Sequence, residues 1–407
     1  MMIESLKTFL RPLKQTLQNK YIEHCLSKKI LKHKTSSVDF DFEVFKDDLL
    51  AFVASMKVEN SGFEYRYSRS CSIPVLYASM FACLTLGILG GLADYSADMK
   101  RRWAEYFDSF QREEDGLFYD PVTQNDLYDQ SDWWGGRHLA ALLVAAYALL
   151  GHRPRYPFAF LKQYSLDYLQ TWLNEIDWED PDRENNDLDN RIMNIGALLQ
   201  YQRDAWGDRC AADSLEILKS TVKQKLQPET GLWGRFDIDN AEQKSRMVHF
   251  AYHLLSIFFY DGDFDFDADA IVRHALAPQN RWGGFGVSCN TSACDDIDSI
   301  CLLTSFYNFV DDALRGQIRN ALERAFGWVL LNKTFDGGFV FKYKQKFQYG
   351  CEEMTGRGEE GALFPSWFRS LSLAYMASVL PFSQDFHVFR APGCYAFPYQ
   401  ALNRGER

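Results

Sequence analysis

The stretch Trp282-Gly283-Gly284-Phe285-Gly286 predicts the fold, because versions of it recur along the chain. Each version sets a glycine beside an aromatic or apolar residue, and a segment of helical periodicity follows. Glycine permits a positive φ after a helix, and the aromatic ring can pack beneath the next helical pair. The other copies are Ser61-Gly62-Phe63, Asp115-Gly116-Leu117-Phe118, Thr230-Gly231-Leu232-Trp233-Gly234 and Asp336-Gly337-Gly338-Phe339.

The spacing of these glycines indicates an internal repeat of about 55 residues. Successive intervals are 54, 115, 53 and 54 positions for Gly62, Gly116, Gly231, Gly284 and Gly338. Because the second interval is about twice the others, a degenerate copy is expected near Ile176-Asp177-Trp178. Six such units fill most of the 407-residue chain.

Two kinds of helical segment alternate between the turns. The first kind is apolar nearly all round, as expected of buried inner helices: Ile73 to Leu89, Gly136 to Leu150, Asn190 to Tyr201, Ser245 to Phe259, Asp298 to Val310 and Trp367 to Leu380. The second kind is amphipathic, as expected of outer helices: Phe45 to Lys57, Ala97 to Arg112, Phe160 to Asn174, Asp213 to Leu226, Asp267 to Leu276 and Leu314 to Leu331. The main stretch with a strand-like alternation is Phe339 to Tyr343.

We therefore predict an all-α fold, an (α/α)6 double-ring toroid of helical hairpins around an apolar cavity. The toroid is expected to occupy residues 37–385, between a basic amphipathic segment at residues 1–36 and a C-terminal tail at residues 386–407.

Charge is distributed unevenly along the chain. The net charge is −11, but residues 1–34 carry a local balance of +6. The acidic remainder argues against nucleic acid as a partner. The basic segment could lie on an anionic membrane surface, or it could pack its apolar stripe on the domain.

The protein is expected to be cytoplasmic, with peripheral membrane association through residues 1–34 left open. The sequence contains neither a continuous apolar run long enough to span a bilayer nor a secretory signal. Nine cysteines occur without Cys-x-x-Cys spacing, so free thiols are expected rather than a zinc knuckle or a redox pair.

The most informative polar cluster is Cys294-Asp295-Asp296-Ile297-Asp298-Ser299, at the opening of an inner helix. A helix N-terminus favours carboxylates, and capping accounts for one aspartate but not for three. Crowded carboxylates push one another's pKa values apart, and a protonated one is suited to acid catalysis. Adjacent aspartates also suit Mg²⁺.

Other inner helices open with further polar and aromatic residues. His249 and His253, four positions apart, share one helical face but lack an HExxH context for zinc, so we expect them to be hydrogen-bonded cavity histidines. Aromatic residues of the turns and helix openings are expected either to line the cavity or to pack in the core. The residues expected to bind substrate are Trp133, Trp134, His138, Asn190, Arg191, Arg246, His249, Trp282, Phe285 and Trp367.

Asn280-Arg281-Trp282-Gly283-Gly284-Phe285-Gly286, followed by Asp296-Ile297-Asp298-Ser299, resembles the class II terpene cyclases of the squalene-hopene cyclase type. That family consists of α/α toroids in which an Asp-x-Asp-Asp motif opens an inner helix. The glycine-aromatic turns also resemble the protein prenyltransferase β subunits, whose zinc ligands are not matched here. The repeat covers nearly the whole chain, but the motif covers only about twenty residues.

The terpene cyclase resemblance implies roles for the three aspartates. Asp298 matches the general acid that protonates an alkene or epoxide, and Asp296 matches its hydrogen-bond partner. Ser299 replaces the last aspartate of the motif, so Asp295 is expected to take its place. The implied function is cyclisation of an isoprenoid in an apolar cavity. No metal ligand is assigned to the protein, and Mg²⁺ is a possible cofactor if the substrate is a diphosphate.

Two alternatives remain open at this stage. A carbohydrate-active (α/α)6 enzyme, namely a glycoside hydrolase, lyase or epimerase, would use Asp132, Asp189 and Asp298 as acid/base candidates. Arg137, Arg191 and Arg246 would then hold a uronate, and Trp133 or Trp367 would stack on a sugar ring. A non-catalytic lipid-binding or scaffold toroid would use its aspartates only as helix caps. The polarity of the cavity distinguishes the first two.

Overall fold

The computed structural model describes residues 17–29, 36–124, 128–181, 187–234, 237, 239–382, 386–387 and 389–393. These residues are predominantly helical, and the sheet among them consists of two short strands, β1 (Phe347–Gln348) and β2 (Thr355–Gly356). The predicted all-α fold class is confirmed. The strand-like stretch at 339–343 was placed wrongly, because it forms isolated bridges and the strands follow it.

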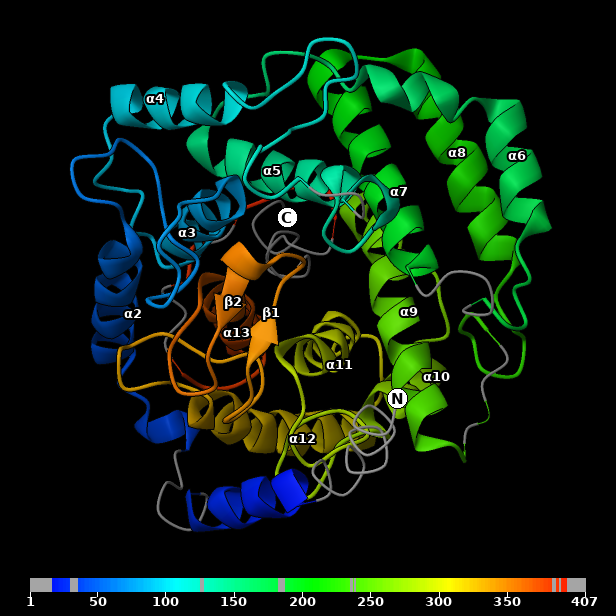
Figure 1. Ribbon diagram of the computed structural model, residues 1–407. Helices are drawn as coiled ribbons and strands as arrows, with labels where there is room; N and C mark the ends of the chain where they lie inside the picture. The colour runs from blue at the N-terminus through cyan, green and yellow to red at the C-terminus, as the bar shows by residue number, and fades with distance from the viewer. Residues whose placement is uncertain are drawn as a thin grey trace, which may run out of the picture.

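Six buried helices form a closed inner ring. Each packs against the next, and the last returns to the first, as Figure 1 shows. The six are α3 (Leu76–Ile88), α5 (Gly136–Leu150), α7 (Leu188–Trp206), α9 (Ala241–Tyr260), α11 (Ala293–Ser305) and α13 (Leu363–Ala377). Closure means that every inner helix is covered by two neighbours, which explains why these segments are apolar nearly all round.

Six amphipathic helices form the outer layer, and each precedes one inner helix in the chain. They are α2 (Phe42–Met56), α4 (Ala97–Asp108), α6 (Leu166–Glu175), α8 (Arg209–Gln224), α10 (Ala268–Leu276) and α12 (Asp312–Leu331). Every one begins after a serine or aspartate whose side chain accepts a first-turn N–H, which stabilises the helix start: Asp41, Ser96, Ser165, Asp208, Asp267 and Asp311. The predicted helical hairpins are thus present.

The glycine-aromatic turns join outer to inner helices, and four of them contain an isolated β-bridge. The end of an outer helix pairs with an aromatic residue beyond the glycine in the bridges Lys57↔Tyr65, Gln111↔Phe118, Gln279↔Phe285 and Lys333↔Phe339. In the Gly-Gly copies the first glycine has the positive φ, +101° at Gly283 and +92° at Gly337. In the first copy Asn60 (φ 60°) is left-handed, and Gly62 is not.

The expected degenerate copy follows α6. Trp178 is buried there, and its indole N–H donates to the carbonyl of Leu173 at 2.8 Å.

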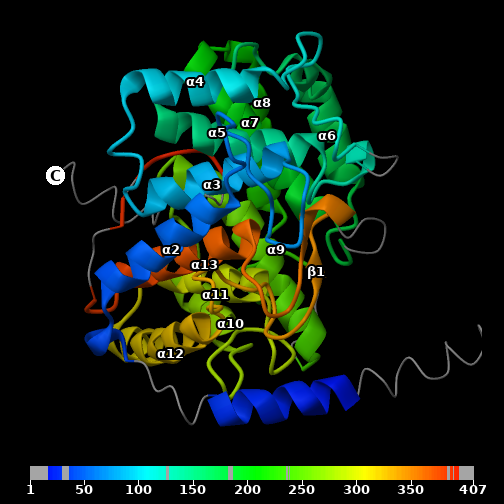
Figure 2. The same ribbon diagram turned by 60° about the vertical axis from the view of Figure 1, so that its left-hand side comes forward.

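The helix at residues 17–29 packs against the outside of the ring beside α12 (Figures 1 and 2). Ile22 and Leu26 are buried against Trp328 and Leu331. The Lys29 ammonium donates to the Leu331 carbonyl at 2.6 Å. This part of the basic segment therefore turns its apolar stripe to the domain, whereas residues 1–16 and 30–35 lie outside the described residues. Among the residues described, no helix has both the length and the hydropathy of a membrane span.

The turn glycines provide a test of the repeat. A Cβ on Gly337 would lie 2.5 Å from the Asp48 carbonyl oxygen, and its φ disfavours any other residue. We expect Gly337→Ala to lower the free energy of unfolding by about 1–3 kcal/mol. Gly316 is the matched control, because it lies inside α12 with open space around it, and Gly316→Ala should raise stability by about 0.5–1 kcal/mol. Urea denaturation measures both, and equal effects of the two substitutions would contradict the assigned turn.

Candidate functional site

A cavity of about 210 Å³ lies within the ring, at the end where inner helices begin and the β1–β2 hairpin crosses. We call it the chamber. Its walls come from the starts of α5, α7 and α13, the middle of α9, the first turns of α11 and the hairpin. The lining residues are Trp133, His138, Asp187, Asn190, His249, Tyr252, His253, Cys294, Asp298, Phe341, Phe347, Tyr349, Phe364 and Phe368.

The acidic cluster lies inside α11 rather than before it. The helix begins at Ala293, and a capping box precedes the other aspartates. The Asp295 N–H donates to the Ser292 hydroxyl at 3.0 Å, while the Ser292 N–H donates to the Asp295 carboxylate at 2.9 Å. Asp295, expected to share in catalysis, thus forms the capping box of α11 and lies outside the chamber lining.

Asp296, expected to be a hydrogen-bond partner of Asp298, is fully buried and is bound by other residues. Its carboxylate accepts hydrogen bonds from the Phe285 N–H (2.9 Å) and the Thr291 hydroxyl (2.7 Å). The Trp328 indole (2.8 Å) and the Arg369 guanidinium (2.9 Å) also donate to it. These donors come from the glycine turn, α12 and α13, so Asp296 joins three elements to α11. Its expected role beside Asp298 stays a prediction.

Asp298, two positions further along α11, faces the chamber. Its Oδ2 accepts a hydrogen bond from Nδ1 of His249 at 2.7 Å. Its Oδ1 is buried without a hydrogen-bond partner among the described residues. Although burial of the imidazole opposes protonation, the neighbouring carboxylates of Asp298 and Asp189 raise the pKa of His249 above its ordinary value. The pair is thus a hydrogen-bonded acid and base at the chamber wall.

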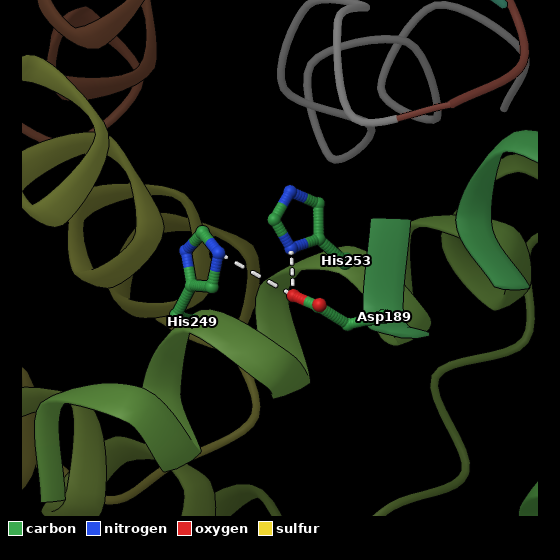
Figure 3. Close-up of side chains that lie close together, drawn as sticks. All are labelled: Asp189, His249 and His253. Atoms are coloured by element: carbon green, nitrogen blue, oxygen red, sulfur yellow. Dashed lines mark hydrogen bonds and ion pairs between the residues drawn. The ribbon is translucent and has the colours of Figure 1, made fainter. Parts of the chain in front are cut away.

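Asp189 lies behind this pair and is held by three side chains. Arg246 donates to both of its carboxylate oxygens at 2.9 Å. Figure 3 shows His253 and His249 approaching the same oxygen, with His253 Nδ1 at 2.7 Å and His249 Nε2 at 3.4 Å. Burial of the Asp189 carboxyl group would raise its pKa, but His253 and Arg246 hold that pKa well below its usual range. Asp189 therefore remains a carboxylate that orients two histidines.

Asp189, His249 and His253 are also close enough to share a metal ion, with one ligand atom from each within 4.8 Å of the others. Two observations favour a hydrogen-bonded network instead. The Arg246 guanidinium already occupies both Asp189 oxygens, and a divalent cation would have to bind beside that positive charge. The hydrogen bonds among the three residues account for their proximity.

His138 is held as a neutral imidazole. The Asn194 side-chain amide donates to the Asp132 carbonyl at 2.7 Å, so its oxygen is the atom facing His138. Nδ1 of His138 lies 3.2 Å from that oxygen and must donate the proton. Burial lowers the pKa of His138 to about 3. The other ring nitrogen, Nε2, is consequently a hydrogen-bond acceptor.

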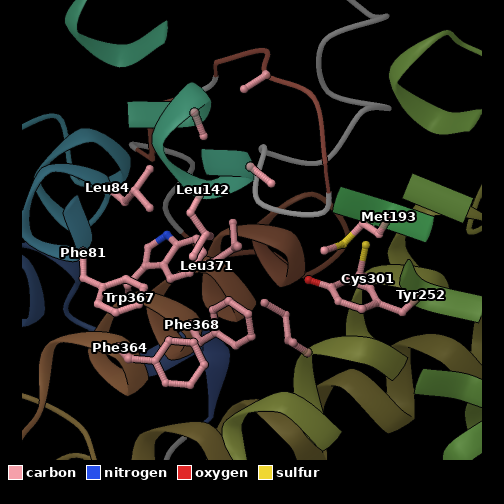
Figure 4. Packing of buried hydrophobic residues seen from close by; sticks show 14 of the residues in the cluster. Phe81, Leu84, Leu142, Met193, Tyr252, Cys301, Phe364, Trp367, Phe368 and Leu371 are labelled. Carbon is pink, nitrogen blue, oxygen red and sulfur yellow. The ribbon is translucent and has the colours of Figure 1, made fainter. Parts of the chain in front are cut away.

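Aromatic side chains form the opposite wall. Phe341, which precedes the hairpin, stacks on Phe347 of β1 with ring centroids 3.7 Å apart, and Phe364 and Phe368 of α13 lie 4.6 Å apart. Figure 4 shows the α13 pair beside Trp367, which stacks instead on Phe81 within the core. The wall continues to Trp133, whose carbonyl accepts the Tyr349 hydroxyl at 3.2 Å.

Four predicted substrate-binding residues line the chamber, namely Trp133, His138, Asn190 and His249. Arg246 adjoins it through Asp189 but is absent from its lining. The remaining predicted aromatic residues serve the core or the turns. Trp367 and Phe285 are fully buried, and Trp134 packs against Tyr128 and Gly350, whereas Trp282 packs beside the 17–29 helix.

Arg191, also predicted to bind substrate, lies outside the lining. It donates to the Tyr168 hydroxyl at 3.2 Å and stacks on Trp172 at 4.6 Å.

Sequence reasoning missed the aromatic wall almost entirely. Phe364 and Phe368 share one face of α13 at i and i+4, which was a usable signal beside the predicted Trp367. Phe341 lies inside the stretch Phe339 to Tyr343, whose alternation was interpreted as a strand. Phe347 and Tyr349 carried no usable period, because each strand of the hairpin is two residues long.

No family model matches this chain, and no curated protein matches it. Among solved structures, the chain is similar to a possible member of the GH105 family from Salmonella enterica subsp. enterica serovar Paratyphi A. The match covers 84% of this chain and 95% of that chain, with 11% sequence identity and a TM-score of 0.40. Agreement at this level assigns neither a family nor an activity to this chain.

The neutral His138 makes a testable contribution to stability. Its pKa of about 3 lies below the ordinary 6.5, so between these values the unfolded chain binds a proton that the folded chain does not. Its contribution to the unfolding free energy is complete above about pH 6.5 and is lost as the pH falls. Urea denaturation of His138→Gln should therefore show a shallower loss of stability between about pH 7 and 4.5 than the unsubstituted protein. If the unfolding free energies of the two proteins fell in parallel with pH, His138 would not be the neutral buried imidazole assigned here.

Proposed function

We propose that this chain is a carbohydrate-active enzyme that performs acid–base chemistry on a sugar ring bound in the chamber. The observation that carries the proposal is the two-sided lining, with paired polar side chains on one wall and aromatic faces on the other. A sugar ring has the same division, because its C–H face is apolar and its hydroxyl edge forms hydrogen bonds. The carbohydrate alternative is thereby favoured over isoprenoid cyclisation.

The polar wall is the reason for this preference. It contains His138, Asp187, Asn190, His249, His253 and Asp298, nearly half of the lining residues. A bound isoprenoid would remove these groups from water without offering hydrogen bonds in return, and burying an unsatisfied polar group costs about 1–3 kcal/mol. Sugar hydroxyls can replace the lost water as hydrogen-bond partners. The aromatic wall then supplies the apolar contact that holds the ring.

Asp298 is the carboxylate best suited to carry the proton. Of the three acid/base candidates in the carbohydrate interpretation, Asp132 and Asp189 each form a bidentate ion pair, with Arg137 and Arg246 respectively. Their oxygens are committed to permanently charged partners. Asp298 pairs instead with His249, which can itself gain or lose a proton, and presents Oδ1 without a described partner.

In the proposed reaction Asp298 Oδ1 accepts a proton from the substrate or from an attacking water. His249 donates its Nδ1–H to Oδ2 and so orients the carboxylate and stabilises its charge. The same pair can return the proton in a later step. This chemistry is common to glycoside hydrolysis, elimination and epimerisation.

A direct test is incubation of the purified protein with neutral, amino and uronic acid glycosides, with products identified by NMR in D₂O. Hydrolysis releases a reducing end, elimination creates a carbon–carbon double bond, and epimerisation exchanges a ring hydrogen for deuterium. Because proton transfer by a positioned side chain contributes about 10²–10⁴-fold, Asp298→Asn and His249→Gln should each lower kcat by that order.

Asp265→Asn is the matched control for these substitutions, since that aspartate is 96% exposed. It should keep full activity. Unchanged turnover by Asp298→Asn with a native circular dichroism spectrum would exclude Asp298 as the proton carrier.

Isoprenoid cyclisation is the second candidate, and one specific observation favours it. The buried, unpartnered Oδ1 of Asp298 shares the chamber with six aromatic side chains besides Tyr252, whose faces stabilise cations. Squalene and geranylgeranyl diphosphate therefore belong in the same assay. Their cyclisation, with all sugars unchanged, would replace the carbohydrate proposal.

A further inference from the structure

We propose that the sugar bound in the chamber carries a protonated amino group, so that the substrate class is an amino sugar rather than a uronic acid. The inference rests on the proposed carbohydrate function and deepens it. Three features support it: the protonation pattern of the histidines in the lining, the carboxylates in the lining, and the pairing of the nearby arginines with other carboxylates.

The histidines of the polar wall present acceptors. His253 lies with Nδ1 2.7 Å from the Asp189 carboxylate, so Nδ1 carries the proton and donates. Burial and the neighbouring His249 lower the pKa of His253, which keeps its ring neutral. His138 donates through Nδ1 to Asn194 in the same way. In both rings Nε2 then carries no proton and can accept a hydrogen bond. A ligand group that donates a hydrogen bond suits such a nitrogen.

The carboxylates of the lining add further acceptors. Asp298 is 2% exposed, and its Oδ1 has no hydrogen-bond partner among the described residues. Asp187, the N-cap residue of α7, accepts hydrogen bonds from the Ser131 hydroxyl (3.1 Å) and the Asp132 N–H (3.3 Å). Burial raises the pKa of Asp187, which shows that its charge is held at a cost. An ammonium group placed against it would reduce that cost.

The arginines expected to hold a uronate are directed elsewhere. Arg137 forms a bidentate pair with Asp132, and Arg246 does the same with Asp189. The described lining contains neither lysine nor arginine. Its cationic candidate is His249, which lies between the carboxylates of Asp298 and Asp189. A uronate would therefore enter a wall of acceptors, whereas an ammonium meets carboxylates on one side and aromatic faces on the other.

Binding of four free monosaccharides, measured by isothermal titration calorimetry at low salt, tests the inference without requiring turnover. Glucosamine should bind at least about tenfold more tightly than glucose, because one charge-assisted contact is gained. N-acetylglucosamine should lose that advantage, since acetylation removes the charge at nearly the same position. Glucuronate should bind most weakly. The advantage of glucosamine should fall as salt is added.

The Asp187→Asn variant locates the contact. Asparagine keeps the size of the side chain and an oxygen that can accept from the Ser131 hydroxyl and the Asp132 N–H, so the variant is expected to fold. Its ratio of glucosamine to glucose affinity should fall to about one, while Asp265→Asn, altered at an exposed aspartate, should keep the full ratio.

The outcomes separate the inference from the proposed function. Equal binding of glucose, N-acetylglucosamine and glucosamine overturns the inference and leaves a carbohydrate enzyme of neutral specificity. Preferential binding of glucuronate overturns the inference as well. Failure of all four sugars to bind, with an isoprenoid bound instead, contradicts the proposed function and the inference with it. Should Asp187→Asn fail to fold, the comparison of glucosamine with N-acetylglucosamine on the unsubstituted protein still decides the matter.

Discussion

The buried carboxylate of Asp296 is the constraint on which the chamber depends. It accepts hydrogen bonds from the glycine turn, α12 and α13, and its partner Arg369 is equally buried. Removing one member of such a pair costs about 3–5 kcal/mol, because the other is left charged away from water. Since Asp296 lies one helical turn from the start of α11, these contacts also determine the rotation of that helix. That rotation turns Asp298 toward the middle of the ring.

The closed ring explains how charges are distributed around the polar wall. Helix starts converge at one end, and carboxylates placed there are favoured by the helix dipoles. Two of these carboxylates, Asp132 and Asp189, are neutralised behind the wall by Arg137 and Arg246. Each bidentate pair removes a guanidinium from ligand binding. What remains exposed to the chamber is a set of acceptors and one titratable pair, and this set favours proton transfer on a ligand rich in donors.

The amino-acid sequence predicted where the site lies. It did not predict the full set of side chains that line the chamber. Asp298, His249, His138, Asn190 and Trp133 were expected at the cavity because they open or line inner helices, and all five line the chamber. Asp295 and Asp296 belong to the same short motif, yet one caps the helix and the other is buried behind it. Neighbouring positions on a helix differ by about 100° in direction, so a motif four residues long necessarily faces several environments.

The aromatic residues also show how far the sequence predicts the composition of the site. Trp282, Phe285 and Trp367 lie at positions where the repeat demands an apolar side chain, and they pack as repeat residues do. Two of the aromatic residues that line the chamber, Phe347 and Tyr349, come from a short hairpin in which no period marks them.

The sequence by itself determined that this chain forms a ring of six helical hairpins, because the repeat length, the turn glycines and the alternation of apolar and amphipathic helices are local properties. Only the tertiary structure decided which side chains meet in the chamber and which neutralise one another. The physical reason is that inner helices are apolar nearly all round, so their hydrophobic periodicity gives little information about which face looks inward. The pairing of Asp298 with His249 joins positions 49 residues apart, and no local pattern records such a contact.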